Sequence, residues 1–335
     1  MPCAIVIAGP KIRQAEGTVA ARSPLSGLDG RTAFLAGVEV LGRSVIGRVV
    51  EDLRHGNVDA ISVFVDRSFI PSRFEESANI APYLTADAWQ SASRKLISLR
   101  DSGVDAVLIA RVGAYMEFDP KDAIQQHCQQ GAVVTRACDK QGPLDLWIID
   151  PTRFDAQENL LRALLAEPAA NYEVPGYVNR LEHPEDLRRL VVDGLTSRCA
   201  FRPQGNEVRP GVWMAEGAQI DRGARVVTPA FIGRSARISE QCLITRCSNV
   251  ESNSYVDYGT VVEDSTILSN TYVGIGLDLS HSIVGGHSLL SLRHNVILEI
   301  SDPVVMRENK PRTEADRLRS TDFGFGEMAL LSAEE

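Results

Sequence analysis

One stretch of the chain, residues 218–268, places an aliphatic residue at every sixth position. The aliphatic positions are Ile220, Val226, Ile232, Ile238, Ile244, Val250, Val256, Val262 and Leu268. Two places before each of them stands a small or short residue, and these residues are Ala218, Ala224, Ala230, Ala236, Cys242, Ser248, Ser254, Thr260 and Thr266. An α-helix and a simple strand have other periods, so neither accounts for this spacing. The fixed period indicates a repeat architecture.

Each repeat predicts one short strand followed by a corner. Three repeats would complete a triangular coil in which the aliphatic residue points inward and the small residue eases the turn. Stacked coils bury an apolar column that no single repeat could bury alone. The segment therefore resembles a left-handed parallel β-helix of the hexapeptide-repeat type. Beyond Leu268 the pattern weakens, and the inward positions become Gly274, Ser280, Gly286 and Leu292. We expect the coils to continue loosely to about Ile300.

The part of the chain before the repeats alternates strand-like and helix-like stretches. Strands are expected at residues 3–8, 60–65, 105–110, 132–137 and 146–149. Helices are expected at residues 41–55, 85–102, 120–130, 154–165 and 184–192. This alternation predicts a mostly parallel α/β sheet with helices on both faces. The patterns thus divide the chain into an α/β domain over 1–195, a repeat domain over 196–306 and a tail over 307–335, with a helix near 313–319.

Composition and charge narrow the choice of partners. The net charge is -9, and no basic block compensates it, which argues against a nucleic-acid partner. The six cysteines lack CxxC spacing, so we expect buried, reduced thiols and neither a disulfide framework nor a zinc site. The apolar start, residues 1–8, has no charged n-region and is too short for a signal peptide or a membrane span. We therefore expect a cytoplasmic protein without a membrane partner.

The order of the two domains and several short segments resemble the nucleotide-sugar pyrophosphorylases, a family of sugar-phosphate nucleotidyltransferases. Residues 8–14 (AGPKIRQ) stand where the family has its phosphate-binding loop, A-G-x-G-T-R-L. Residues 40–46 (VLGRSVI) and 107–113 (VLIARVG) stand at the V-x-G-K-P-L and G-D segments. Residues 176–187 (GYVNRLEHPEDL) are similar to the linker that carries G-T-P-E-D. The resemblance implies a Rossmann-like nucleotidyltransferase domain whose vestigial nucleotide-binding residues are Ala8, Gly9, Lys11, Arg13, Arg111 and Gly113.

Departures from the family motifs bear on activity. Backbone N–H groups must approach a bound phosphate closely, which glycine permits, but Lys11 replaces the second loop glycine and Pro10 has no N–H. The family's two metal-binding carboxylates fall at Ala114 and Arg180, and residues 32–40 contain no lysine to match the family's P-K pair. Nucleotidyl transfer depends on a magnesium ion and on positive side chains. The resemblance therefore implies magnesium only if the protein is active.

Two further features concern the nucleotidyltransferase site. Residues 138–145 alone separate two expected strands, whereas the family builds its sugar pocket from several strands in this interval. Glu117 and Asp119 follow Gly113 and offer substitute carboxylates for acid–base chemistry or metal binding. Asp119 also precedes Pro120, which suits a helix cap.

The repeat domain suggests a different chemistry, because hexapeptide β-helices also serve acyltransferases that use a histidine base. His281, His287 and His294 lie in the weakened repeats, and the six-residue spacing of His281 and His287 predicts equivalent corners. A histidine near neutral pKa suits a general base, and a group of histidines also suits zinc. The alternative is that they are hydrogen-bonded corner residues. Arg188 and Arg189 are interpreted as solvated charges.

These observations favour a degenerate, non-catalytic nucleotidyltransferase-like protein with a binding, regulatory or scaffold role in nucleotide-sugar or polysaccharide metabolism. We expect it to bind a nucleotide or sugar phosphate, to pair with an active nucleotidyltransferase and to form a homo-oligomer through its β-helix. One alternative is an active nucleotidyltransferase that uses Lys11, Arg13, Glu117 and Asp119. Another is an acyltransferase that uses His281 or His287.

Overall fold

The structure is a computed structural model that describes residues 2–8, 37–58, 60–66, 83–155 and 159–309. Gly9, Lys11 and Arg13 of the predicted phosphate loop lie outside these residues. The helix expected near residues 313–319 also lies outside them.

The first part of the chain forms a mixed sheet in which parallel pairs predominate. Within the described residues the strand order is β10-β8-β9-β6-β1-β4-β5. The strands are β1 (Cys3–Ala8), β4 (Ala60–Asp66), β5 (Tyr83–Thr85), β6 (Val107–Arg111), β8 (Val134–Asp139), β9 (Gly142–Ile149) and β10 (Ala169–Glu173). All neighbours are parallel except β9, which runs antiparallel to both β6 and β8. The arrangement is compatible with a Rossmann-like domain.

Helices cover both faces of this sheet, as the alternating pattern predicted. They are α1 (Val45–His55), α3 (Ala88–Asp101), α4 (Pro120–Gln130) and α5 (Leu160–Ala166). Successive side chains of a strand point to opposite faces, so Val6 packs in the same core as residues of α1 and α4. Its neighbour Ile5 packs in a second core with residues of α3 and α5.

Some predicted boundaries were wrong for local reasons. Helix α1 begins at Val45 and not at residue 41, because β2 (Glu39–Val40) and β3 (Arg43–Ser44) form a tight hairpin first. The Ser44 hydroxyl then accepts a hydrogen bond from the Gly47 N–H at 3.2 Å and caps the helix. The short interval between two expected strands holds the end of β8, a two-residue turn at residues 140–141 and the start of β9. The two strands therefore form a hairpin, and β9 is antiparallel. Cys128 is exposed and so departs from the expected burial of the cysteines.

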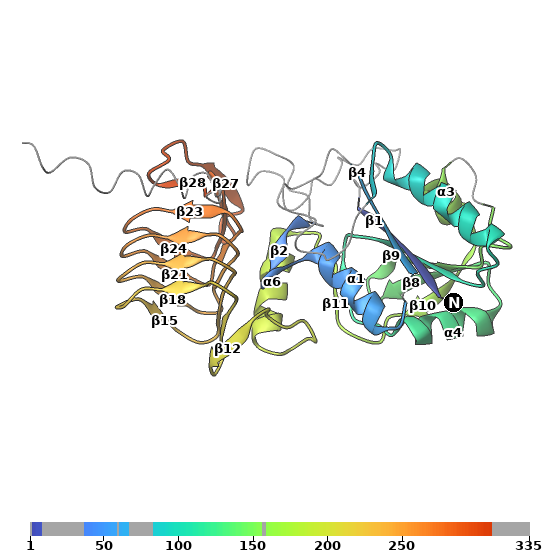
Figure 1. Cartoon of the computed structure of the whole chain (residues 1–335), viewed down its shortest axis with the longest axis horizontal. Helices are drawn as coiled ribbons and strands as arrows, with labels where there is room; N and C mark the ends of the chain where they lie inside the picture. Colours follow the sequence, from blue (N-terminus) through green and yellow to red (C-terminus); the bar gives the residue numbers. More distant parts are fainter. Residues whose placement is uncertain (1, 9–36, 59, 67–82, 156–158, 310–335) are drawn as a thin grey trace, which may run out of the picture.

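Short elements lead from the sheet to the repeats. Strand β7 (Tyr115–Met116) pairs antiparallel with β11 (Val178–Asn179), and helix α6 (Pro184–Leu195) follows. Strands β12 (Asn206–Arg209) and β13 (Val212–Met214) then form an antiparallel hairpin. Figure 1 shows α6 between the sheet and the repeats.

Over residues 212–285 the strands stack as three parallel ladders, here called the stack. The ladders are β13-β16-β19-β22-β25, β14-β17-β20-β23 and β15-β18-β21-β24. Their further strands are β14 (Gln219–Ile220), β15 (Arg225–Val226), β16 (Ala230–Ile232), β17 (Arg237–Ile238), β18 (Leu243–Thr245), β19 (Asn249–Val250), β20 (Tyr255–Val256), β21 (Val261–Glu263), β22 (Thr266–Ile267), β23 (Thr271–Val273), β24 (Asp278–Ser280) and β25 (Ser282–Gly285). The aliphatic residues of the six-residue period, from Val226 to Val262, form one buried core. One strand per repeat is therefore confirmed.

The register changes after Val262, and the prediction for the later repeats was wrong. Val262 pairs with Leu279, 17 residues on, whereas Ile244 pairs with Val262, 18 residues on. The corner between β21 and β22 is residues 264–265, one residue shorter than the equivalent corner 246–248. Buried Ile267 consequently takes the inward position. Leu268 instead packs against the core that contains the sheet.

The small residues of the repeats also have a role in binding the coils together. The Ser248 hydroxyl donates to the Val262 carbonyl at 3.1 Å and accepts from the Ser265 N–H at 3.1 Å. The Thr260 hydroxyl donates to the Gly274 carbonyl at 2.6 Å and accepts from the N–H of the next coil. Because these groups are buried, the hydroxyls satisfy backbone atoms that water cannot reach.

The stack ends at Gly285, so the expected continuation to Ile300 was wrong. Strands β26 (Ser288–Ser291) and β27 (Val296–Glu299) fold back antiparallel to β25 as a hairpin, called the terminal hairpin. Strand β28 (Met306–Glu308) pairs antiparallel with β23. These strands cover edges of the final coil, which limits pairing with other chains.

The α/β part and the stack share one hydrophobic core. Phe231, Ile283 and Leu290 are buried in the same cluster as Leu41 and Leu190. The parts are therefore joined by continuous packing and not by a flexible linker alone.

Candidate functional site

The carboxyl ends of β1 and β6 lie side by side where an open α/β sheet would place a ligand site. The strand order reverses at β1, because β4 lies on one side of it and β6 on the other. In open α/β sheets ligands bind outside the carboxyl ends of the strands at such a point. Ala8 ends β1, is fully buried and pairs with Val65. Arg111 ends β6.

Arg111 pairs with an aspartate that sequence reasoning missed. Its guanidinium forms an ion pair with Asp145 on the neighbouring strand β9. Arg136 of β8 approaches the other carboxylate oxygen of Asp145 at 3.6 Å and donates to the Leu144 carbonyl at 2.9 Å. Gly113 lies against the same carboxylate, since a β-carbon there would be 3.7 Å from an Asp145 oxygen.

Arg180 stands where the resemblance places the second metal carboxylate, and it too pairs with an aspartate. Its Nε donates to Asp139 at 3.1 Å, and its Nη2 donates to the Gly142 carbonyl at 2.9 Å. The hydrogen bond from Arg180 lowers the pKa of Asp139, and it raises the pKa of Arg180 in return. Asp145 also raises the pKa of Arg180.

Together Arg111, Arg136, Arg180, Asp139 and Asp145 form what we call the arginine–carboxylate cluster. Burial is the main cause that lowers the pKa of Arg136, and nearby Asp145 opposes it. The Nε of Arg111 is buried and lacks a hydrogen-bond partner among the described residues. The two carboxylates are thus paired with guanidinium groups, and the buried Nε of Arg111 remains as a donor for an additional acceptor.

The two candidate substitute carboxylates, Glu117 and Asp119, form their hydrogen bonds outside the arginine–carboxylate cluster. Glu117 accepts hydrogen bonds from the Ala200 N–H at 2.5 Å and the Tyr115 hydroxyl at 3.1 Å. Asp119 accepts from the Lys121 N–H at 2.9 Å and caps α4, which confirms its predicted capping role. The structure therefore engages both carboxylates with partners outside the arginine–carboxylate cluster.

The three histidines are arranged differently from the prediction. His281 forms an ion-pair contact with Asp264, which also accepts from Arg188 at 2.8 Å. His287 lies in the turn between β25 and β26, because the stack has ended there. The expected stacking of His281 and His287 at equivalent corners was therefore wrong. His281 instead lines a pocket with His294.

Arg188 was wrongly interpreted as a solvated charge. Only 7% of its side chain is exposed, whereas 56% of the Arg189 side chain is exposed. Its Nε donates to the Asp264 carbonyl at 3.1 Å, and its Nη2 donates to the Arg246 carbonyl at 3.2 Å. The helical spacing gave a signal, because Arg188 lies three residues before buried Val191 on α6.

Glu251 is a second buried charge that sequence reasoning missed. Its carboxylate accepts from the N–H groups of Leu41 and Gly42, at 2.8 and 2.9 Å, and from the Asn249 side chain at 2.6 Å. Burial raises the pKa of Glu251 to about 7, and the neighbouring Glu39 adds to the rise, while the hydrogen bonds oppose it. No local sequence pattern distinguishes Glu251 from the other glutamates of the chain. Its burial therefore could not be predicted from the sequence.

No family model matches the chain, and no curated protein matches it. Within the described residues, no group of three or more His, Cys, Asp or Glu side chains is placed to hold a metal ion. No helix in that part of the chain is long and apolar enough to cross a membrane.

Proposed function

We propose that this chain is a degenerate sugar-phosphate nucleotidyltransferase-like protein that binds ligands or partners without catalysing nucleotidyl transfer. It combines a Rossmann-like nucleotidyltransferase domain with a left-handed parallel β-helix. The observation that carries the proposal is the pairing of Arg180 with Asp139 where a metal carboxylate was expected.

Electrostatics supports a binding role. A transferase of this class needs carboxylates that can hold a magnesium ion against the phosphates. In the arginine–carboxylate cluster, Asp139 and Asp145 already face guanidinium groups, so a metal would have to displace partly buried ion pairs. Breaking such pairs is costly because a charge is left uncompensated. An anionic nucleotide or sugar phosphate could instead be bound by arginine directly.

A thermal-shift screen tests this proposal. The full chain is heated with nucleoside triphosphates, nucleotide sugars and sugar phosphates, each with and without magnesium. Binding to the folded state raises the melting temperature. We expect a shift that does not need magnesium and that weakens in Arg111→Lys, while Arg189→Ala, which changes an exposed arginine, retains it.

The opposite result would support an active enzyme. A magnesium-dependent shift with one triphosphate, together with pyrophosphate release when a sugar 1-phosphate is added, would overturn the non-catalytic proposal. Lys11, Arg13, Glu117 and Asp119 would then be the residues to substitute.

The contact between His281 and Asp264 favours a second candidate, an acyltransferase. A carboxylate that orients a histidine is the usual arrangement of a general base. Acetyl transfer from acetyl coenzyme A to sugar or amine acceptors can be followed by thiol release. His281→Gln should abolish the transfer, whereas His287→Gln, in the hairpin turn, should not. Absence of thiol release with the unaltered protein would eliminate this candidate.

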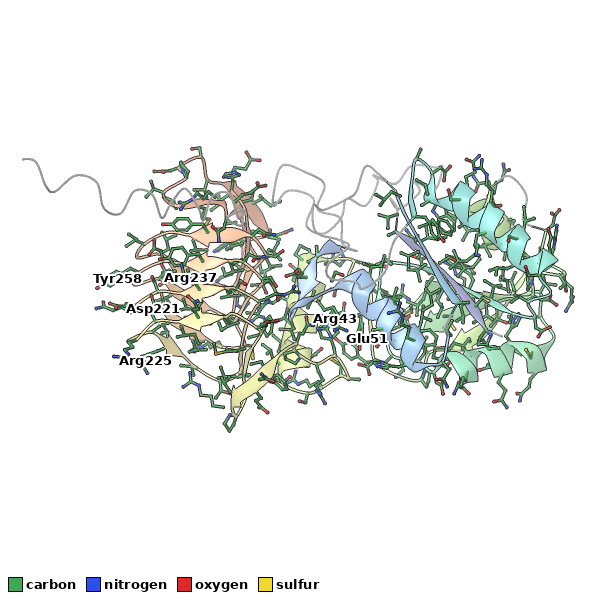
Figure 2. All side chains as sticks on the ribbon, viewed as in Figure 1. Arg43, Glu51, Asp221, Arg225, Arg237 and Tyr258 are labelled. Atoms are coloured by element: carbon green, nitrogen blue, oxygen red, sulfur yellow. The ribbon has the colours of Figure 1, made fainter. Side chains whose placement is uncertain are left out.

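We further propose that the outer flank of the stack mediates a homo-oligomer or contact with an active nucleotidyltransferase. Tyr258 and Ile275 occupy the same corner in successive coils, where the Gly276 N–H donates to the Tyr258 carbonyl at 2.9 Å. Their exposed fractions are 43% and 62%. Figure 2 shows Tyr258 with Asp221 and Arg225 at the edge of the stack farthest from the α/β part.

A further inference from the structure

A pocket lies between helix α6 and the terminal hairpin, apart from the arginine–carboxylate cluster. Its volume is about 660 Å³, which falls within the range of small-molecule sites. The lining residues come from both parts of the chain, and they are Glu185, Arg188, Ser280, His281, Ser291, Leu292, Arg293 and His294. A molecule bound there would contact α6 and the stack together.

Arg188 lines this pocket and carries a buried donor without a partner among the described residues. Its Nε and Nη2 are bound to Asp264 and to a backbone carbonyl, which holds the guanidinium in place. Its Nη1 is buried and has no hydrogen-bond partner among the described residues. Such a donor is unfavourable until an acceptor reaches it. A fixed, desolvated guanidinium matches the oxygens of a phosphate or carboxylate.

The opposite wall adds an arginine and a histidine. Arg293 and His294 lie in the exposed turn between β26 and β27. In the described part of the chain neither side chain forms an ion pair. His281 stands beside Asp264 at the base of the hairpin. Glu185 is the one carboxylate in the lining, and with Ser280 and Ser291 it offers acceptors for hydroxyl groups.

We propose that this pocket binds a small hydroxylated anion, such as a sugar phosphate or a sugar acid. The anionic group pairs with Arg188 and Arg293, and the hydroxyl groups bond to Glu185 and the two serines. None of the residues that line this pocket belongs to the arginine–carboxylate cluster, so the proposal does not depend on the binding proposed for that cluster. Because the pocket has walls from both parts, the bound ligand also strengthens their junction.

Calorimetric titration of the full chain tests the proposal with four probes. Glucose 6-phosphate carries a phosphate and hydroxyl groups, gluconate a carboxylate and hydroxyl groups, inorganic phosphate the anion alone, and glucose the hydroxyl groups alone. Titrations are matched in ionic strength with potassium chloride. We expect glucose 6-phosphate or gluconate to bind more tightly than inorganic phosphate, and glucose not to bind. Whichever of glucose 6-phosphate and gluconate binds more tightly shows whether the preferred anionic group is a phosphate or a carboxylate.

Variants locate the binding. Arg293→Ala changes an exposed turn and should weaken binding about tenfold or more, as expected for loss of a charged hydrogen bond. Arg189→Ala on the same helix changes an exposed arginine and should leave binding unchanged. Arg188→Lys keeps the positive charge but loses the planar guanidinium with its several N–H donors, so it should also weaken binding. Equal affinity in Arg293→Ala and the unaltered chain, or no binding of either hydroxylated anion, would overturn the proposal.

Discussion

The carboxylate of Glu251 accepts a hydrogen bond from the backbone N–H of Leu41, 210 residues earlier in the chain, at 2.8 Å. The glutamate belongs to the corner after β19, and Leu41 to the turn between β2 and β3. Leu41 has a positive φ of 51°, and Gly42 has one of 87°. The two parts of the protein are therefore joined by a buried carboxyl group that holds a tight turn.

The first prediction is a dependence of stability on pH that originates at Glu251. Its pKa is about 7 in the folded state, whereas an unperturbed glutamate has a pKa of 4.5, so the folded state retains the proton between these values. The stabilising contribution is present below pH 4.5 and is lost as pH rises through 7. We expect the free energy of unfolding to fall by on the order of 1–3 kcal/mol between about pH 5 and 8. Urea unfolding at several pH values measures it.

Glu251→Gln is the matched variant for this test. It removes the titration, so the decline with pH should become shallower. Some decline should remain, because burial also raises the pKa of Asp52 to about 6, which has the same sign. An unchanged pH profile in Glu251→Gln would contradict the assignment.

The second prediction concerns close packing at Gly42. A β-carbon there would lie 2.9 Å from the Phe231 ring, and the backbone has a positive φ of 87°. Gly103 also has a positive φ, of 71°, but its β-carbon would meet open space. Gly103→Ala should cost about 1 kcal/mol for conformation alone, and Gly42→Ala about 1–3 kcal/mol more because of the contact with Phe231. Denaturant midpoints measure both, and equal losses would contradict the packing account.

The third prediction separates two buried serines of the stack. Ser254 donates to the Leu268 carbonyl at 2.7 Å and accepts from the Thr271 N–H at 3.2 Å. The hydroxyl of Ser252 is buried and has no partner among the described residues. Ser254→Ala should therefore cost about 1–3 kcal/mol, whereas Ser252→Ala should be neutral or stabilising. Thermal unfolding of both variants decides it, and similar losses would argue against the role of the hydroxyls between coils.

The fourth prediction tests Arg180 as the replacement for a metal carboxylate. Arg180→Asp leaves Asp139 and a new carboxylate without a guanidinium, so the melting temperature should fall by several degrees, as expected for about 2 kcal/mol. Mn²⁺ should recover part of this loss, because carboxylate oxygens suit that ion. The melting temperature of Arg180→Ala should fall by a similar amount, and Mn²⁺ should not recover it. If Mn²⁺ shifts both variants equally, the position is not equivalent to a metal ligand.

The fifth prediction concerns assembly. Light scattering coupled to size-exclusion chromatography should find more than one copy per particle if the outer flank is an interface. Tyr258→Glu and Ile275→Glu should each reduce the mass to that of one chain, because a charge would be buried in the contact. Leu165→Glu, at a similarly exposed apolar residue on helix α5 of the α/β part, should not. A single-chain mass for the unaltered protein would eliminate the homo-oligomer and leave the partner contact to test.

Pattern reasoning succeeded where one local period controls burial and was limited where a single residue shifts the register. The aliphatic repeat predicted the strands up to Val262 because each inward residue must repeat with the coil. The short corner at residues 264–265 moved the inward position from Leu268 to Ile267. Both are apolar, so composition could not distinguish them before the ladders were known.

The sequence by itself determined that this protein has an alternating α/β part followed by a six-residue repeat, because each pattern has only one way to bury its apolar face. The sequence also marked Arg111, Gly113 and Arg180 as positions worth examining. Only the tertiary structure decided how the charges pair. Arg188 meets Asp264, 76 residues away, and Asp145 meets Arg111, 34 residues away. Such pairs depend on how strands register and how the two parts dock, and no local period records either.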